Sequence, residues 1–201
     1  GQTRNVTCQH RVVRHQVMAE RHRLGDLQMR EPRHDRVGVP FGEIQQRVML
    51  AVAPPLRVVV YRRLMLRIAQ AIAGKAHAGA LVTGEVIGQV ASQTLENLTT
   101  IGSVATLPVF RPLIGMDKDE ITAEAQRLGT YPISIIEDQD CCQLFTPRHP
   151  ATRARRDEID AAERTLPIDD FVRQAVESAV VEDFNFPVIK YPVTQDSSQA
   201  T

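Results

Sequence analysis

The chain has 201 residues, enough for one large domain or two small ones and for a buried hydrophobic core. With 43% hydrophobic and 24% charged residues it has the composition of a globular protein, and no apolar run reaches the roughly 18 residues of a membrane-spanning helix. Its formal net charge is zero, so no strong overall positive field indicates a nucleic-acid partner. Its three cysteines, two of them adjacent, argue against a disulfide scaffold and predict a reducing compartment, the cytoplasm.

The first segment, residues 1–38, differs in composition from the rest of the chain. Residues 1–36 hold eight arginines and four acidic residues, with no aromatic residue and no strong core pattern. This composition predicts a poorly ordered segment or a weak helix. Two interpretations stay open: a basic arm, or a segment read from an out-of-frame or wrongly assigned start.

A regular apolar pattern runs over residues 39–184, and residues 185–201 are predicted to be a loop-like tail. The clearest helix is expected over 116–129, where Asp117 and Glu120 can form a capping box and Gly129 can end the helix. Further helices are expected over 41–52 and 57–74, within 89–105, and near 153–163 and 168–183. Short strands are expected over 79–84, 107–113 and 131–136.

Short strands that alternate with longer helices predict an α/β fold, a partial Rossmann-like parallel sheet flanked by helices. In such sheets ligands bind outside the carboxyl ends of the strands. Those ends are "TGE" at 83–85, "RPLIG" at 111–115, and the approach to Cys141. We therefore expect three loops to converge on one edge of the sheet.

Two patterns near this edge could bind an anion. The stretch "VTGEVIGQVASQ" is expected to begin a helix directly after a strand, so Gly84 and Gly88 would let a ligand approach free N–H groups. A plain turn is the alternative. Arg62 and Arg63 point about 100° apart on a predicted helix, so at most one is expected to face a site, and solvated surface charge is the alternative.

The cysteine pair Cys141-Cys142 also allows more than one interpretation. A metal site needs further ligands, and His149 is the one nearby candidate, so no metal is expected. A nucleophilic or sulfur-carrying thiol needs positive surroundings, which arginines 148, 153, 155 and 156 could supply while also binding phosphates. Asp138 and Asp140 would oppose the thiolate, and a buried inert pair is the remaining alternative.

An ordered set of sequence strings resembles the ThiI-type tRNA sulfurtransferases, the tRNA 4-thiouridine synthases. The strings are "VPFGEIQQ", "YRRLMLRIA", "ALVTGEVIGQVASQTLENL", "RPLIGMDKDEI", "RLGTYPISI" and "DCCQLFTPRHP". The resemblance covers Val39 to Phe184 and implies the later part of a PP-loop ATP pyrophosphatase domain, of the adenine nucleotide alpha-hydrolase type.

The resemblance implies an enzyme that uses ATP, with Mg²⁺, to adenylate O4 of a uridine in tRNA. A persulfide sulfur received from a cysteine desulfurase then replaces the activated oxygen, and AMP leaves. The family is also linked to sulfur transfer for thiamine biosynthesis. Carried over by matching motifs, Arg62, Gly84 and Gln93 are similar to the ATP contacts. Cys141 is similar to the sulfur carrier, with Cys142 as the residue that would resolve the persulfide, although the doublet does not fix which is which.

The sequence also departs from the family pattern. It contains no SGGxDS sequence, the loop that binds pyrophosphate in the family, and no counterpart of the domains that recognise tRNA. We therefore expect a C-terminal part of the enzyme with impaired activity. One rival hypothesis is a non-catalytic α/β fragment or partner-binding module, which could form an oligomer through its open sheet edge. Another is a PP-loop enzyme with a different acceptor, against which the cysteine pair argues.

Overall fold

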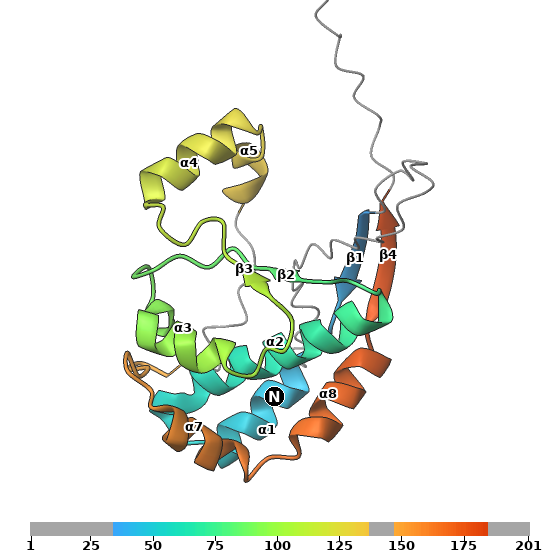
Figure 1. Ribbon diagram of the computed structural model, residues 1–201, viewed down its shortest axis with the longest axis vertical. Coiled ribbons are helices and arrows are strands. Elements are labelled where there is room, and N and C mark those ends of the chain that lie inside the picture. Colours follow the sequence, from blue (N-terminus) through green and yellow to red (C-terminus); the bar gives the residue numbers. More distant parts are fainter. Residues whose placement is uncertain (1–33, 137–146, 185–201) are drawn as a thin grey trace, which may run out of the picture.

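The computed structural model describes residues 34–136 and 147–184, and four of its helices pack around one long helix (Figure 1). That helix, α2 (Arg57–Lys75), contacts the helices α1, α3, α7 and α8. Val60, Leu64 and Ile68 are buried, so the spacing of four in the sequence identified its inward face correctly. In the described part of the chain no helix combines the length and the apolar character that crossing a membrane requires.

Helices from both ends of the described chain cover α2. They are α1 (Gly42–Ala51), the short 3-10 helix η1 (Pro54–Leu56), α7 (Arg156–Glu163) and α8 (Ile168–Glu177). Val48, Ile159 and Phe171 are fully buried between them. The Arg47 guanidinium lies 4.5 Å from the centre of the Phe171 ring, a cation–π contact that joins α1 to α8. The predicted helices over 41–52 and 57–74 are confirmed.

The parallel sheet is small in the described residues. Strand β2 (Leu81–Val82) pairs with β3 (Val109–Phe110), with Leu81 opposite Val109 and Val82 opposite Phe110. A further bond from Thr83 N to the Phe110 carbonyl, at 2.9 Å, extends the pairing past the strand end. The prediction of an α/β fold with a parallel sheet flanked by helices is confirmed, and both strands lie where the sequence predicted them.

The prediction that a helix begins directly after β2 is wrong. Residues 83–90 form a loop, a 3-10 turn η2 (Ala91–Gln93) follows, and α3 (Leu95–Gly102) begins only after Thr94. Thr94 caps α3, because its hydroxyl accepts from Asn97 N at 3.2 Å. Gly88 has φ +81°, a left-handed conformation that interrupts a helix. The anion site of a helix N-terminus is therefore not formed next to Gly84.

The predicted strand over 131–136 is also wrong. After α4 (Lys118–Arg127), whose Asp117–Glu120 capping box is confirmed, Gly129 turns the chain with φ +70° into a short helix α5 (Tyr131–Ser134). Pro132 lies in the first turn of α5, where its missing N–H group costs nothing. Residues 131–136 are therefore not the third strand, whose carboxyl end we expected on the approach to Cys141.

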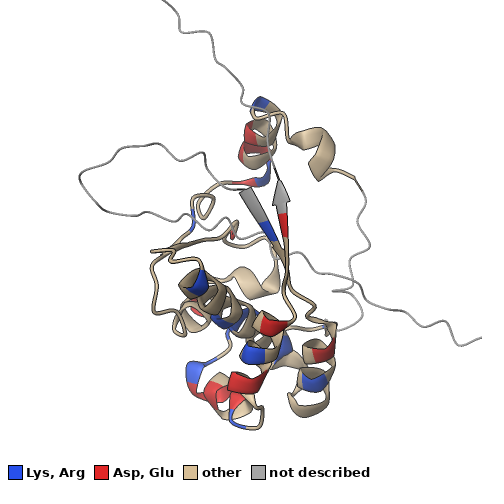
Figure 2. Cartoon of the chain, turned by 90° about the vertical axis from the view of Figure 1, so that its right-hand side faces the viewer, with Lys and Arg blue, Asp and Glu red and all other residues tan. Residues whose placement is uncertain are grey.

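A second, antiparallel pair of strands joins the two ends of the described chain. Strand β1 (His34–Gly38) pairs with β4 (Val180–Phe184), and the two strands lie side by side (Figure 2). Arg36 and Glu182 form an ion pair across them at 3.5 Å. The helix predicted to reach residue 183 therefore ends early, because the backbone of 180–184 bonds to β1. The division at residue 38 stays a prediction, although residues 34–38 pair with a segment assigned to the domain.

Candidate functional site

The candidate site lies where the two parallel strands end. The loop after β2 brings Glu85 to the edge, and Arg111 follows β3 directly. Arg111 Nε donates to Glu85 Oε2 at 2.5 Å, so the two strand ends are joined by an ion pair. The expectation that the loops at 83–85 and 111–115 converge is confirmed, because parallel strands place their carboxyl ends side by side.

Glu85 is the centre of a hydrogen-bonded group at this edge. Its side chain is 11% exposed and accepts from Arg62, from Arg111, and from the hydroxyl of Thr83 at 3.0 Å. Three donors satisfy a carboxylate in a mostly buried position, where an unpaired charge would be costly. The arrangement fixes two guanidinium groups at the loop.

Arg62 brings the three predicted nucleotide residues into one neighbourhood. One of its terminal nitrogens, Nη2, donates to Glu85, the residue after Gly84. The other, Nη1, donates to the carbonyl of Ser92 at 3.0 Å and to its hydroxyl at 3.1 Å, and Ser92 precedes Gln93. A single side chain from α2 thus contacts the chain neighbours of both Gly84 and Gln93.

Gly84 and Gln93 both have groups that a ligand could reach. Gly84 is exposed, and a side chain added to it would meet no atom within 4 Å. The backbone of Gln93 is fixed, since its carbonyl accepts from Gly88 N at 2.9 Å. Its side-chain amide has no hydrogen-bond partner in the described part of the chain, so it keeps two donors and an acceptor for a bound molecule.

Arg63 has a different role from its neighbour Arg62. Its side chain is 4% exposed and pairs with Asp160 at 2.6 Å and with Glu163 at 2.9 Å, both on α7. Their positions on the helix predicted that at most one of these adjacent arginines faces a site, and in the structure the two point to different partners. Arg63 holds two helices together, while Arg62 contacts the loop at the strand ends.

The downstream arginines lie at the surface. Arg153 is 3.4 Å from Glu96, Arg155 pairs with Asp157 at 2.6 Å, and Arg156 begins α7. The pKa of the Asp157 carboxyl is lowered below its ordinary value, chiefly because it accepts hydrogen bonds from Arg155. Arg153 lies before α7, which begins at residue 156.

Some of the expected site falls outside the described residues. Cys141 and Cys142 lie there, so their predicted roles stay predictions. Within residues 34–136 and 147–184, no group of three or more His, Cys, Asp or Glu side chains could hold a metal ion. Glu85 and Arg111 lie in the stretches 83–85 and 111–115 that the sequence predicted as strand ends, where ligand-binding residues are expected, but neither was assigned a role there.

Comparisons with known proteins find relatives over most of the chain. Residues 14–168 match the family described as "Thiamine biosynthesis protein (ThiI)", a match that includes residues 14–38, which the sequence analysis left outside the resemblance. A probable tRNA sulfurtransferase of Thermus thermophilus is 52% identical over 149 residues, which are 74% of this chain and 37% of that protein. One of Nocardia farcinica is 48% identical over 143 residues, 71% of this chain and 35% of that protein.

A solved structure gives the same result in three dimensions. It is a 4-thiouridine synthetase–RNA complex with bound ATP, 42% identical, with a TM-score of 0.72 over 76% of this chain and 40% of that one. The chain thus spans less than two fifths of the length of the two curated relatives. The family match covers most of the chain and includes the whole strand-end site, and the chain therefore belongs to the thiamine biosynthesis protein (ThiI) family.

Proposed function

We propose that this chain supplies part of the ATP-binding edge and the sulfur-carrying cysteine of a tRNA sulfurtransferase that makes 4-thiouridine. The names of its relatives and the RNA and ATP bound to its structural neighbour support this activity. Because the sequence contains no SGGxDS loop, we expect impaired thiolation by the chain alone. Sulfur transfer for thiamine biosynthesis is the second activity that family membership suggests.

The contacts of Arg62 are the observation that carries the nucleotide part of the proposal. They bring Gly84 and Gln93 to one side of the strand ends, where open α/β sheets bind ligands. In this role Arg62 offsets phosphate charge, Gly84 lets the nucleotide approach the main chain, and the Gln93 amide hydrogen-bonds to the nucleotide. All three assignments follow from the family motifs, and the contacts of Arg62 with Glu85 and Ser92 support them.

Magnesium, in this proposal, arrives with the nucleotide. Mg²⁺ usually keeps several water ligands and binds through one or two carboxylates together with substrate phosphates. Glu85, the carboxylate at the edge, already accepts from two arginines, and the described residues contain no metal-binding cluster. An ion held mainly by the phosphates of ATP fits these residues and would neutralise part of the phosphate charge.

The proposed sulfur chemistry belongs to Cys141 and Cys142. The thiolate of Cys141 attacks the terminal sulfur of a desulfurase persulfide, forms a new S–S bond, and releases the desulfurase thiolate. Adenylation makes O4 of the uridine a good leaving group, so the carried sulfur can replace it as AMP departs. Cys142 is the proposed resolving thiol: its thiolate attacks Cys141 Sγ and forms a transient disulfide, which breaks the bond between Cys141 and the carried sulfur and leaves that sulfur on the uridine.

The proposed partners are tRNA and a cysteine desulfurase. Arg153 and Arg156 are exposed and could contact phosphates of the RNA, because their present partners are surface acids that contribute little. We expect the chain to act in the cytoplasm, where cysteines stay reduced. Self-association is a further expectation, to be checked by measuring molecular mass at several protein concentrations.

Transfer of labelled sulfur tests the proposed function. The chain is incubated with a cysteine desulfurase and ³⁵S-labelled cysteine, and protein-bound sulfur that a thiol reductant can release is counted. We expect Cys141→Ser to lose nearly all of the label and Cys142→Ser, the matched control, to keep it. Unchanged labelling of Cys141→Ser would remove Cys141 from the mechanism, and unlabelled wild-type chain would contradict the sulfurtransferase assignment.

A further inference from the structure

Arg111 has hydrogen-bonding capacity that the described protein does not use. Its Nε donates to Glu85, whereas its two terminal Nη groups have no hydrogen-bond partner in the ranges that the structure describes. The side chain is only 22% exposed, so these groups are partly removed from water. A guanidinium in such a position gains most from an anion that accepts two parallel hydrogen bonds.

Glu85 fixes the direction in which Arg111 can bind. The guanidinium is planar, so holding Nε on one carboxylate oxygen sets the orientation of the Nη fork. Glu85 is itself held by Thr83 and Arg62, which makes it a rigid support. Glu85 is therefore a positioning residue and acts through the two arginines.

Gly102 leaves space beside the terminal Nη groups of Arg111. Arg111 Nη2 lies 3.5 Å from the place where a side chain on Gly102, the last residue of α3, would begin. A larger residue at 102 would extend beside the fork, so glycine keeps that approach open. Arg62 and Arg111 both pair with the one carboxylate of Glu85, so two guanidinium groups lie close together at this edge.

We propose that Arg111 is a further phosphate-binding residue of the nucleotide edge, positioned by Glu85 next to Arg62. The proposal deepens the function proposed above and rests on it. The ligand is a phosphate group of the nucleotide, because Arg111 extends from the same strand-end loops as Gly84 and shares its carboxylate partner with Arg62. RNA phosphates are the competing class of ligand, which the experiment separates.

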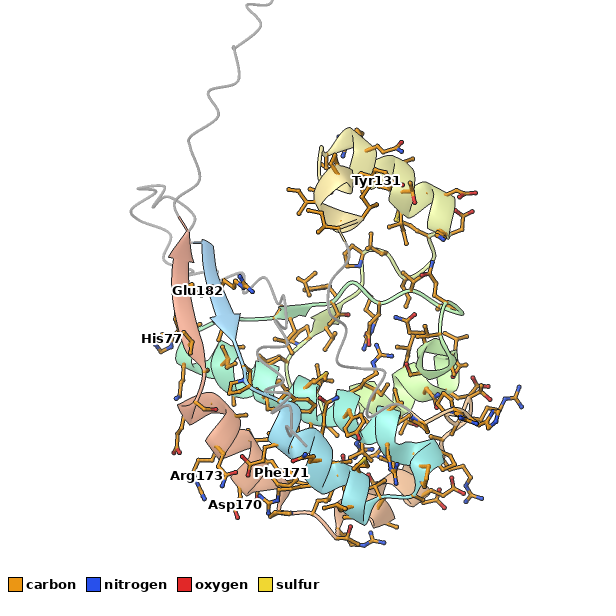
Figure 3. The ribbon with its side chains drawn as sticks, turned by 180° about the vertical axis from the view of Figure 1, so that it is seen from behind. His77, Tyr131, Asp170, Phe171, Arg173 and Glu182 are labelled. Atoms are coloured by element: carbon orange, nitrogen blue, oxygen red, sulfur yellow. The ribbon has the colours of Figure 1, made fainter. Side chains whose placement is uncertain are left out.

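The test compares nucleotides that differ in charge. Titration calorimetry on the whole chain measures affinities for ATP and for adenosine in the presence of Mg²⁺. We expect Arg111→Ala to weaken ATP binding about tenfold, the effect of losing hydrogen bonds to a charged group, and to leave adenosine binding unchanged. Arg173→Ala removes an exposed arginine on α8 that pairs with Asp170 (Figure 3) and should change neither affinity.

The remaining outcomes also decide the question. If Arg111→Ala does not fold, Arg111→Lys takes its place, since it keeps the charge and loses the fork, and a selective loss of ATP affinity again supports the proposal. A short RNA is titrated in the same way. The proposal is overturned if Arg111→Ala leaves the ATP affinity unchanged, if it weakens ATP and adenosine binding equally, or if it weakens only the binding of the RNA. If the unaltered chain binds no ATP, the nucleotide part of the proposed function fails as well.

Discussion

At the scale of single residues, Asn97 joins backbone segments that are distant in the sequence. Its amide nitrogen donates to the carbonyls of Ala91 at 3.0 Å and Ala151 at 2.8 Å, and its oxygen accepts from Ala154 N at 2.8 Å. The side chain is fully buried. It therefore ties the turn next to Gln93 to the segment that leads into α7.

Asn97→Ala should destabilise the fold by about 3 kcal/mol, because it removes three hydrogen bonds and leaves buried backbone groups without partners. Urea denaturation followed by circular dichroism measures the free energy of unfolding. Thr99→Ala is the matched control, since Thr99 is exposed on the same helix and should cost no more than about 0.5 kcal/mol. Equal losses of unfolding free energy in the two variants would show that the buried hydrogen bonds of Asn97 stabilise the fold no more than an exposed threonine does.

Sequence patterns identified Arg62, Gly84 and Gln93 but missed Asn97, Glu85 and Arg111. Arg62, Gly84 and Gln93 stand in motifs that resemble a family, so they could be identified without three-dimensional information. The role of Asn97 depends on backbone groups up to 57 residues away, which no local pattern reveals. Arg62 and Arg63 could be separated in direction by helical geometry, but their partners could not be predicted.

At the scale of elements, one ion-pair cluster fixes α2 against α7. Glu163 accepts from Arg67 at 2.8 and 2.9 Å and lies 2.9 Å from Arg63 Nη2. Both Glu163 and Arg63 are buried, and Arg63 Nε already has no hydrogen-bond partner among the described residues. The orientation of α2, and with it the direction of Arg62, depends on this contact.

Removing Glu163 should therefore be costly. We expect Glu163→Gln to lower the free energy of unfolding by about 3–5 kcal/mol, because it leaves the Arg63 charge buried with a weakened partner set. Asp170→Asn breaks an exposed pair with Arg173 at 2.7 Å and should cost at most about 1 kcal/mol. Chemical denaturation of both variants side by side makes the comparison, and a loss below 1 kcal/mol for Glu163→Gln would contradict the assigned role.

Long helices were predictable from their apolar period, whereas the two local errors have physical causes. Residues 131–136 are apolar enough for a strand, but Pro132 fits the first turn of a helix, and Ile133, Ile135 and Ile136 remain exposed. Residues 83–94 read as a helix until the left-handed φ of Gly88 is known. The strand pair β1–β4 joins residues from 142 (Gly38 and Val180) to 150 (His34 and Phe184) positions apart, so the partner of either strand could not be identified from that strand alone.

At the scale of the whole molecule, α2 connects the core to the candidate site. Its buried face packs against α1, α3, α7 and α8, while Arg62 extends from it to the loops after the parallel strands. Acidic and basic residues of the described chain are mixed over the helices rather than gathered on one side (Figure 2). Anion binding therefore depends on the local arginine pair and not on a general positive field.

Titration of ATP, with Mg²⁺, into the whole 201-residue chain is the decisive measurement. The unaltered chain and Arg173→Ala should bind ATP equally, while Arg62→Ala should bind it about tenfold more weakly, since it loses charge-assisted contacts to the nucleotide. Circular dichroism establishes that each variant is folded. Failure of the unaltered chain to bind ATP, or equal affinity in Arg62→Ala, would contradict a nucleotide site at this sheet edge.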